Sequence, residues 1–394
     1  MGKIMGSGGS TRRDARRAAS EATAQAMRRL RSAQPAFGFV FASADHNLDI
    51  AMTEVERQTG CAAVVGSSTA GGLTETGRID DGVVVMLAAS TETQQRVDFG
   101  QGLKAEHQKL ASQFTQTATE MKPAARTSGR RHLTSILLTD GLAGTGEDLV
   151  RAMFEQSTSV AQIVGGAAGD SGRFKETMVA AGQNCATDAA AVLHVFDSKP
   201  WGIGVKHGLR PTTKPMRVTA SDRNVIYTIE DEPAFETYKR HAKERWIDLT
   251  PANASAYMVA NELGVHFFSS VSRARAPLSV GSDGSITCAA PVPQGSYVSI
   301  LDGEPTSMIA AAREAAEEAR DRLGGAEAAG VLLFDCVCRG MILREEFGKE
   351  IDAVRLVFGD VPVAGFLTYG EIAQSAGRLE GWHNATAVVA AIPA

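Results

Sequence analysis

Several side chains that could bind or transform a small molecule lie in the C-terminal third of the chain. Cys336-Val-Cys338-Arg339 comes directly after the apolar run Val331–Phe334. An arginine at this place can hold a carboxylate through two parallel hydrogen bonds. A nearby guanidinium can also lower a thiol pKa, so that Cys336 or Cys338 becomes reactive. Along a strand Cys336 and Cys338 would share one face, which does not match the C-x-x-C spacing of a zinc site.

A second group of polar residues follows the apolar run Val361–Gly365 and the last turn before the C-terminal strand. We expect Glu371 to accept an amine, while neighbouring hydroxyl and amide groups fix the orientation of a ligand. His383 and Asn384 could hold a ligand or orient Glu371, or Asn384 could bond only to its own turn. The residues of this group are Thr368, Tyr369, Gly370, Glu371, His383 and Asn384.

Two glycine-rich stretches resemble sites for other chemistry, and their spacing argues against it. Asp140-Gly-Leu-Ala-Gly-Thr-Gly-Glu-Asp148 lacks the spacing of a phosphate loop, and its last two carboxylates would repel a phosphate at a helix start. Gly66-Ser-Ser-Thr-Ala-Gly71 has Ala70 where a nucleophile elbow needs glycine. We therefore expect helix capping and turn formation here, rather than phosphate binding or serine catalysis.

Three stretches of the chain repeat one order of elements, and these elements must position the polar residues. Each has an apolar strand with a polar end, a helical segment, a β-branched run that stops at Gly66, Gly165 or Gly365, and a further apolar strand. The pattern predicts an α/β fold with mixed sheets built from repeated β-α-β-turn-β units. Small residues at the strand ends would then surround a concave polar site.

The composition indicates a soluble protein of the cytoplasm. A net charge of −5 argues against a broad nucleic-acid-binding surface. The five cysteines are odd in number and scattered, which fits reduced thiols better than a disulfide framework. A run of about 18 apolar residues is absent, so we expect no membrane span, and the N-terminus lacks the apolar stretch of a secretory signal.

The sequence divides into an N-terminal arm and two domains. Residues 1–10 are rich in glycine and serine, so we expect them to be disordered. Thr11–Ser32 predicts an Arg- and Ala-rich helix, either lying on the first sheet or forming a basic arm for an acidic partner or a membrane surface. Together residues 1–34 would form a flexible basic arm. We place the domains at 35–232 and 233–394, because Pro233 suits the first turn of a helix.

Five segments in a fixed order resemble the signature segments of the FIST family. They are Val65-Gly-Ser-Ser-Thr-Ala-Gly71, Val164-Gly-Gly-Ala-Ala-Gly-Asp170, Phe334-Asp-Cys-Val-Cys-Arg339, Val363-Ala-Gly-Phe-Leu-Thr-Tyr-Gly-Glu371 and His383-Asn-Ala-Thr386. The likeness runs from about Pro35 to Ile392 and implies a FIST N-terminal and a FIST C-terminal domain. It also implies a sensory module for small ligands, with amino acids as proposed ligands.

The resemblance implies ligand-facing roles for a set of residues. The chain departs from the family pattern at Ser67, Gly72 and Leu209, so its C-terminal half matches that pattern better than its N-terminal half. The residues to which the resemblance assigns ligand contacts are Ser68, Thr69, Gly165, Asp170, Cys336, Arg339, Tyr369, Glu371, His383 and Asn384.

We expect a non-catalytic sensor that binds an amino acid or a small carboxylate, with Arg339 holding the carboxylate. No output domain follows Ile392, so the signal would pass to a separate protein such as a histidine kinase or a diguanylate cyclase. No resident cofactor, metal or catalytic residue is expected. Two alternatives stay open: a haem-based nitric-oxide sensor that uses His207 or His383, and an enzyme that uses Cys336 or Cys338 as its nucleophile.

Overall fold

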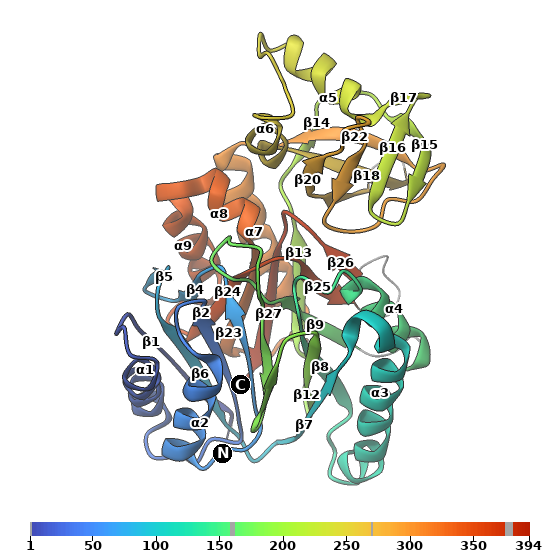
Figure 1. Ribbon diagram of the computed structural model, residues 1–394. Helices are drawn as coiled ribbons and strands as arrows, with labels where there is room; N and C mark the ends of the chain where they lie inside the picture. The colour runs from blue at the N-terminus through green and yellow to red at the C-terminus, as the bar shows by residue number, and fades with distance from the viewer. Residues whose placement is uncertain (1, 158–161, 269–270, 375–380) are drawn as a thin grey trace.

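A computed structural model describes residues 2–157, 162–268, 271–374 and 381–394. It has a large body of mixed sheets with helices on their outer faces, and a smaller domain above it (Figure 1). The two ends of the chain meet at the base of the large body, where the Lys3 Nζ donates to the Pro393 carbonyl oxygen at 2.8 Å. The expected mixed α/β fold is confirmed.

The large body consists of three units that follow one another along the chain. The first contains β1 (Ile4–Ser10), α1 (Ala15–Leu30), β2 (Phe37–Ser43), α2 (Leu48–Thr59), β3 (Val64–Thr69), β4 (Gly72–Thr74), β5 (Gly77–Ile79) and β6 (Val83–Ala89). The second contains β7 (Thr93–Gln101), α3 (Leu103–Thr127), β8 (His132–Thr139), α4 (Gly146–Gln156), β9 (Gln162–Ala167), β10 (Val179–Ala181), β11 (Asn184–Ala186) and β12 (Ala189–Asp197). The third contains β13 (Gly202–Lys206), α7 (Pro305–Asp321), β23 (Ala328–Cys336), α8 (Val337–Leu343), α9 (Phe347–Phe358), β24 (Val363–Thr368), β25 (Glu371–Gln374), β26 (Gly381–His383) and β27 (Ala387–Pro393).

The three units pair their strands in the same way, as the repeated sequence pattern predicts. In each, the central strand (β2, β8 or β23) runs parallel to the next one (β3, β9 or β24). The same central strand runs antiparallel to the last strand (β6, β12 or β27), which in turn pairs with the first (β1, β7 or β13). The registers therefore define equivalent positions on the paired strands of the three units.

The units are joined in a ring, because each lends its short hairpin to the sheet of another. The β10–β11 hairpin extends the sheet of the first unit, β25–β26 that of the second, and β4–β5 that of the third. The turns after β3, β9 and β24 consequently meet: the Ala70 N–H donates to Leu367 O, and the Tyr369 N–H donates to Ala167 O, both at 3.1 Å. Polar residues far apart in sequence converge at this centre.

Glycine at the end of the β-branched runs permits this close meeting of backbones. A Cβ atom at Gly165 or Gly365 would overlap the carbonyl oxygen of Leu137 or Leu333 on the neighbouring strand. Gly165 also has a φ of 157°, at the edge of the region that favours glycine. The three glycines that mark the sequence repeat are thus equivalent positions in the structure.

The N-terminal segment is an ordered strand, so the expectation of disorder over residues 1–10 is wrong for the described residues 2–10. β1 pairs along its whole length with β6. Its glycines serve helix packing: a Cβ atom at Gly6 or Gly8 would overlap a backbone carbonyl of α1. Glycine and serine looked like a linker composition, but here they let an alanine-rich helix lie directly on the sheet.

The smaller domain is inserted between β13 and α7 and is yellow to orange in Figure 1. Val218, Ile286 and Ile300 belong to its separate hydrophobic core. The expected boundary between residues 232 and 233 falls inside β17, so this domain takes strands from both sides of it. Its elements are β14 (Arg210–Pro211), β15 (Met216–Asp222), β16 (Val225–Ile229), β17 (Glu232–Pro233), α5 (Ala234–Lys243), α6 (Ala254–Ala260), β18 (Asn261–Phe268), β19 (Val271–Arg275), β20 (Pro277–Val280), β21 (Ile286–Cys288) and β22 (Tyr297–Asp302).

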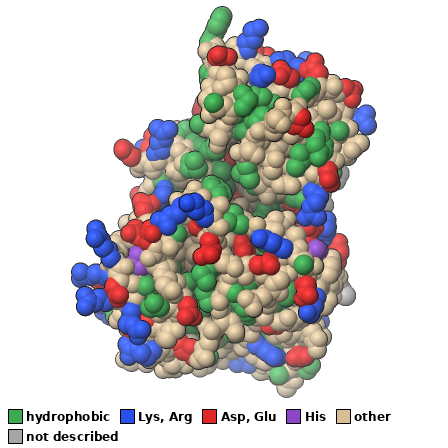
Figure 2. Space-filling model, viewed as in Figure 1, with side chains coloured by type: hydrophobic (Ala, Val, Ile, Leu, Met, Phe, Trp, Pro, Cys, Tyr) green, Lys and Arg blue, Asp and Glu red, His purple; other side chains and the backbone are tan. Residues whose placement is uncertain are grey.

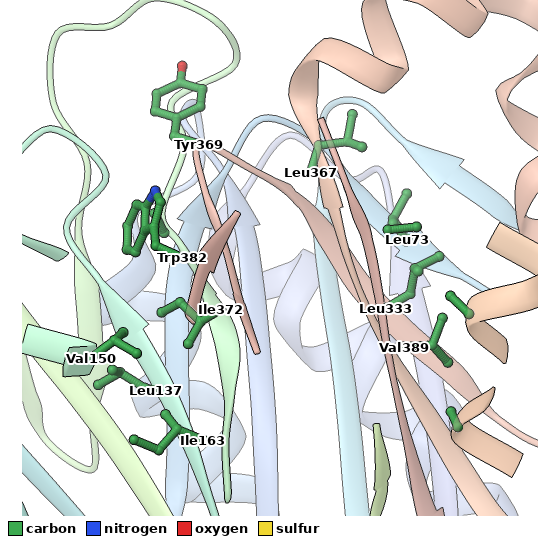
Figure 3. Packing of buried hydrophobic residues seen from close by; sticks show 14 of the residues in the cluster. Leu73, Leu137, Val150, Ile163, Leu333, Leu367, Tyr369, Ile372, Trp382 and Val389 are labelled. Carbon is green, nitrogen blue, oxygen red and sulfur yellow. The ribbon is translucent and has the colours of Figure 1, made fainter. Parts of the chain in front are cut away.

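The main core of the large body ends in aromatic side chains at its upper edge. Figure 3 shows Leu137, Val150 and Ile163 packed between the second sheet and α4, with Trp382 and Tyr369 above them. Both aromatic residues come from the third unit. They cover the end of the second unit where it faces the small domain, and this junction holds the candidate site.

Candidate functional site

A cavity lies between the upper strand ends of the second and third units and the small domain. Its volume open to the centre of a water molecule is about 90 Å³. That is several times the roughly 10–15 Å³ that a cavity needs to hold one water, so the cavity has room for several waters or for a small ligand. Hydrophobic side chains also gather where the small domain meets the large body (Figure 2). The cavity is lined by Asp140, Gly141, Leu142, Gly144, Gly146, Glu147, Phe174, Ala276, Leu278, Ala289, Ala290, Pro291, Cys336, Val337, Cys338, Tyr369, Trp382 and Asn384.

Asn384 is the polar side chain best placed to recognise a ligand. It lies in the turn between β26 and β27, lines the cavity and is only 1% exposed. Among the described residues, neither its amide oxygen nor its amide nitrogen has a hydrogen-bond partner. An unpaired buried polar group costs about 1–3 kcal/mol. A bound molecule that offers both a donor and an acceptor would remove that cost.

Trp382 forms one wall of the cavity and explains two glycines of the lining. A Cβ atom at Gly146, the first residue of α4, or at Gly370 would overlap the indole ring. The indole Nε1 is buried and has no hydrogen-bond partner within the described part of the chain. The glycine-rich stretch before α4 therefore makes space for an aromatic side chain, which the sequence did not indicate.

The three units form three junctions in the ring, and one of these junctions carries the Trp382 indole. The strand registers make Trp382 equivalent to Arg78 of β5 and to Cys185 of β11. Arg78 instead packs over the Phe347 ring, with 5.8 Å between its Cζ and the ring centroid. The three junctions thus share a backbone plan but carry different side chains, and the cavity belongs to the one with the indole.

Tyr369 lines another side of the cavity, and both its hydroxyl group and its ring are held in place by neighbouring side chains. Its hydroxyl donates to Asp170 Oδ1, and its ring stacks on the Phe174 ring with the centroids 4.5 Å apart. Asp170 also accepts the backbone N–H groups of Phe174 at 2.8 Å and Lys175 at 2.6 Å. Burial tends to raise the pKa of Asp170, and these hydrogen bonds outweigh that effect and lower it. Asp170 therefore positions the aromatic wall from behind.

The charged residues of the lining are both acidic, namely Asp140 and Glu147; within the described residues the lining contains no Lys or Arg. Glu147 accepts two hydrogen bonds from Arg275 Nη2 of β19, at 3.0 and 3.1 Å. Asp140 accepts the Leu142 N–H at 2.8 Å. The ion pair of Glu147 with Arg275 joins α4 to β19 of the small domain.

The two cysteines of the lining do not lie on one strand, so that expectation is wrong. β23 ends at Cys336, which caps α8, and Cys338 lies in the first turn of that short helix. The pKa of Cys336 is well above the ordinary thiol value because of its contact with the Cys338 thiol and its burial. For Cys338 the contact with Cys336 favours the thiolate, but burial and the carboxyl group of Glu262 outweigh it, and the pKa is raised. Both thiols are therefore protonated at neutral pH.

Arg339 does not line the cavity; it lies fully buried on the other side of α8 in an ion cluster. Its Nε lies 3.0 Å from Glu350 Oε1 and 3.0 Å from Asp335 Oδ1. The other two nitrogens donate to backbone carbonyls, namely those of His207 (2.7 Å), Met308 (2.9 Å) and Ala385 (3.4 Å). A ligand carboxylate held by Arg339 remains a prediction, since every nitrogen of the guanidinium already has a protein partner.

Glu371 and its neighbours form a buried layer behind the cavity wall. Glu371 accepts the Thr368 hydroxyl at 2.5 Å and the Thr386 N–H at 3.2 Å. Burial, together with the Cys336 thiol, raises its pKa well above the usual carboxyl value. His383 pairs with Glu371 in the β25–β26 hairpin, and burial beside Arg273 and Arg275 lowers its pKa. Burial therefore disfavours the charged forms of both Glu371 and His383.

In the N-terminal half, Ser68 and Thr69, which were expected to contact a ligand, form hydrogen bonds that stabilise the central turns. Ser68 Oγ accepts the Met178 N–H at 2.9 Å, and Thr69 Oγ1 accepts the Gly71 N–H at 3.2 Å. Neither side chain lines the cavity, and Gly165 lies within β9. Of the residues expected to contact a ligand, the structure brings Cys336, Tyr369 and Asn384 together around the cavity.

Other side chains of the site carried no recognised signal in the sequence. Glu262 of β18 is fully buried beside Cys338, and within the described chain neither carboxyl oxygen has a hydrogen-bond partner. Burial raises its pKa well above the usual value. A glutamate alternating with apolar residues in a strand looks like a surface position, so only the docking of the small domain reveals it. No group of three or more His, Cys, Asp or Glu suited to a metal ion occurs in the ranges that the structure describes.

Among the described residues, no helix is long and apolar enough to cross a membrane. No curated protein matches the chain. A chorismatase crystal structure aligns with 99% of this chain and 98% of its own, at 8% identity and a TM-score of 0.37. That likeness is too distant to bear on fold or function.

Two protein-family models match nearly the whole chain. The FIST N domain matches residues 36–232 and the FIST C domain matches residues 234–374. FIST domains are associated with the sensing of small ligands. Four of the five sequence segments lie within these ranges, and His383-Asn-Ala-Thr386 lies beyond them. The resemblance to the FIST family is thereby confirmed, and the chain belongs to that family.

Proposed function

We propose that the protein is a non-catalytic sensor that binds an amino-acid-sized ligand in the cavity beside Asn384. The observation that carries the proposal is the buried amide of Asn384, a residue of the cavity lining, which has no hydrogen-bond partner among the described residues. An amide offers two N–H donors and a carbonyl acceptor. It can therefore pair with a carboxylate and an ammonium group at once, as an amino acid requires.

The remaining lining supports an amino acid with an apolar or aromatic side chain. Leu142, Phe174 and Leu278 supply apolar surface, and Trp382 supplies an aromatic face. Arg275 balances the charge of Glu147, whereas the carboxyl group of Asp140 favours a ligand ammonium group and disfavours a dianion. A ligand with a second carboxylate should consequently bind less well.

The position of the cavity supports a signalling role. The ligand would touch α4 and the third unit from below, and β20 and the segment that follows β21 from above. The ion pair of Glu147 with Arg275 already joins these parts. Binding would therefore bias the angle of the small domain, and a separate protein such as a histidine kinase or a diguanylate cyclase would read that change.

A cysteine-dependent enzyme is the second candidate, because Cys336 and Cys338 both line the cavity. The raised pKa of both thiols favours binding over nucleophilic catalysis. A haem sensor has less support, since neither His207 nor His383 belongs to the cavity lining. Turnover that is lost after thiol modification would favour the enzyme, and a Soret band with haemin would favour the haem sensor.

Thermal unfolding with a panel of amino acids, small carboxylates and haemin tests the proposal. A ligand at one hundred times its Kd adds about 2.7 kcal/mol. For 394 residues the unfolding entropy is about 0.8 kcal/mol per degree, so the midpoint should rise by about 3 °C. Asn384→Leu should abolish the rise, whereas the exposed control Asn184→Leu should keep it. A rise that survives in Asn384→Leu contradicts the proposed site.

A further inference from the structure

We propose that a second cavity, enclosed by α3, α4 and the sheet of the second unit, binds an anion that carries an apolar tail. The cavity has a volume of about 430 Å³, within the range of roughly 300–1,000 Å³ for pockets that hold small organic molecules. It touches the end of α4 opposite to the first cavity, through Met153 and Ser157. This proposal does not depend on the ligand of the first cavity.

Three cations surround this cavity without a balancing acid. Lys122 and Arg126 lie four residues apart on one face of α3, and Arg131 precedes β8. In the described part of the structure none of the three side chains forms an ion pair or a hydrogen bond, and the lining contains no Asp or Glu. Arg126 alone could be explained as a cation at a helix C-terminus. However, the three cations come from α3 and from the segment before β8 and lie around one cavity, which favours an anionic ligand.

The lining of the cavity combines an apolar part with hydroxyl groups of Thr115, Thr119 and Ser157 and with one buried polar pair. Leu133, Met153, Ile163 and Phe196 line it. An anion with a hydrocarbon tail could place its head among the cations at the mouth and its tail against these side chains. Carboxylates of fatty acids and phosphate esters with an apolar group share this chemistry.

The buried polar pair is Ser135 with His194, whose hydroxyl oxygen and Nδ1 are 2.8 Å apart. The strand registers place Gly38 and Leu87 at the equivalent positions of the first unit. In the third unit the equivalents are Val331 and Ala391. The polar pair is therefore particular to the unit that has the cavity, where it adds hydrogen-bonding capacity to the lining.

The same comparison explains why space exists under α3. In the first and third units the helix lies directly on glycines, namely Gly6 and Gly8 on β1 and Gly202 and Gly204 on β13. The second unit has Arg96 and Asp98 at the equivalent positions of β7. Asp98 accepts hydrogen bonds from Gln113 at 2.7 Å and Thr117 at 2.6 Å, and Arg96 pairs with Glu120. Side chains hold α3 off the sheet, which leaves the cavity.

Titration with octanoate, with acetate as the head group without a tail, tests this inference by calorimetry. Wild-type protein should bind octanoate at least tenfold more tightly than acetate, and added NaCl should weaken the binding. Arg126→Gln with Arg131→Gln should lower the octanoate affinity at least tenfold. The exposed Arg28→Gln should leave it within twofold. Both arginines are exposed, so circular dichroism should show an unchanged fold.

Two further variants separate this cavity from the first. Ala118→Met places a larger side chain in the floor and should abolish octanoate binding without a change in charge. Asn384→Leu should keep the wild-type octanoate affinity. The inference is overturned if the double arginine variant binds like wild type, if acetate binds as tightly as octanoate, if Asn384→Leu loses octanoate, or if wild-type protein binds no octanoate.

Discussion

Replacing Arg339 by methionine separates a structural arginine from a ligand-binding one. The side chain is fully buried and serves two carboxyl groups and three backbone carbonyls. Removal of one partner from a buried ion pair costs about 3–5 kcal/mol, because the remaining charges lose their counterion. Burial and the neighbouring Glu350 carboxyl raise the pKa of Asp335, so part of the cost is relieved by protonation.

The expected change is large enough for thermal unfolding to resolve. With an unfolding entropy of about 0.8 kcal/mol per degree for this length, Arg339→Met should lower the midpoint by about 4–6 °C. Arg355→Met is the matched control, because Arg355 forms an exposed ion pair with Asp352 at 3.3 Å. Such pairs contribute about 0–1 kcal/mol, so its midpoint should fall by about 1 °C or less.

Ligand binding decides between the two roles of Arg339. Below its midpoint the folded Arg339→Met protein should bind the ligand of the first cavity with nearly wild-type affinity, because the guanidinium does not line that cavity. A variant with unchanged stability and abolished binding would refute this reasoning. It would restore the carboxylate contact that the sequence predicts for Arg339.

Three other substitutions or treatments probe separate parts of the account. Gly365→Ala should destabilise the protein by about 1–3 kcal/mol in denaturant unfolding, because the added Cβ overlaps the Leu333 carbonyl oxygen. As the control, the Cβ added by Gly348→Ala in α9 meets no neighbour, so this variant should be neutral or stabilising. Equal effects of the two substitutions would contradict the close strand packing. Burial raises the pKa of Glu262 in the folded protein above its unfolded pKa near 4.5. This difference stabilises the folded state at pH values below the unfolded pKa, and that stabilisation is lost as the pH rises through the folded pKa. Glu262→Gln should thus be more stable than wild type at pH 8 and no different at pH 4 in urea unfolding, and a difference at pH 4 alone would contradict the assignment. Native protein at pH 7.5 should react slowly with a disulfide reagent, because Cys336 and Cys338 are buried with raised pKa values; rapid labelling of either would favour the enzyme.

The repeated units were predictable because their signals are local. A β-branched run that stops at glycine reports a strand end in each unit, and Gly66, Gly165 and Gly365 prove to be equivalent. The exchange of hairpins between units was not predictable, since no residue type encodes which sheet a three-residue strand joins. The convergence of the three central turns therefore became visible only in the structure.

The candidate site likewise combines residues that the sequence indicated with residues that it did not. Tyr369 and Asn384 follow strands and carry polar groups, so they stood out in the sequence, and both line the cavity. Arg339 stood out equally, but its partner Glu350 lies on a different helix and turns the arginine into the core. Trp382 gave no signal because an indole next to a turn is normally packing, and its role follows from Gly146 and Gly370 beside it.

The most direct test of the central claim is calorimetric titration of wild type and Asn384→Leu with the amino acid that gives the largest thermal shift. The account predicts saturable one-to-one binding to wild type. It predicts none to Asn384→Leu, although the unliganded variant should be more stable by about 1–3 kcal/mol because a buried unpaired amide is gone. Equal affinity of the two proteins would show that the ligand binds elsewhere.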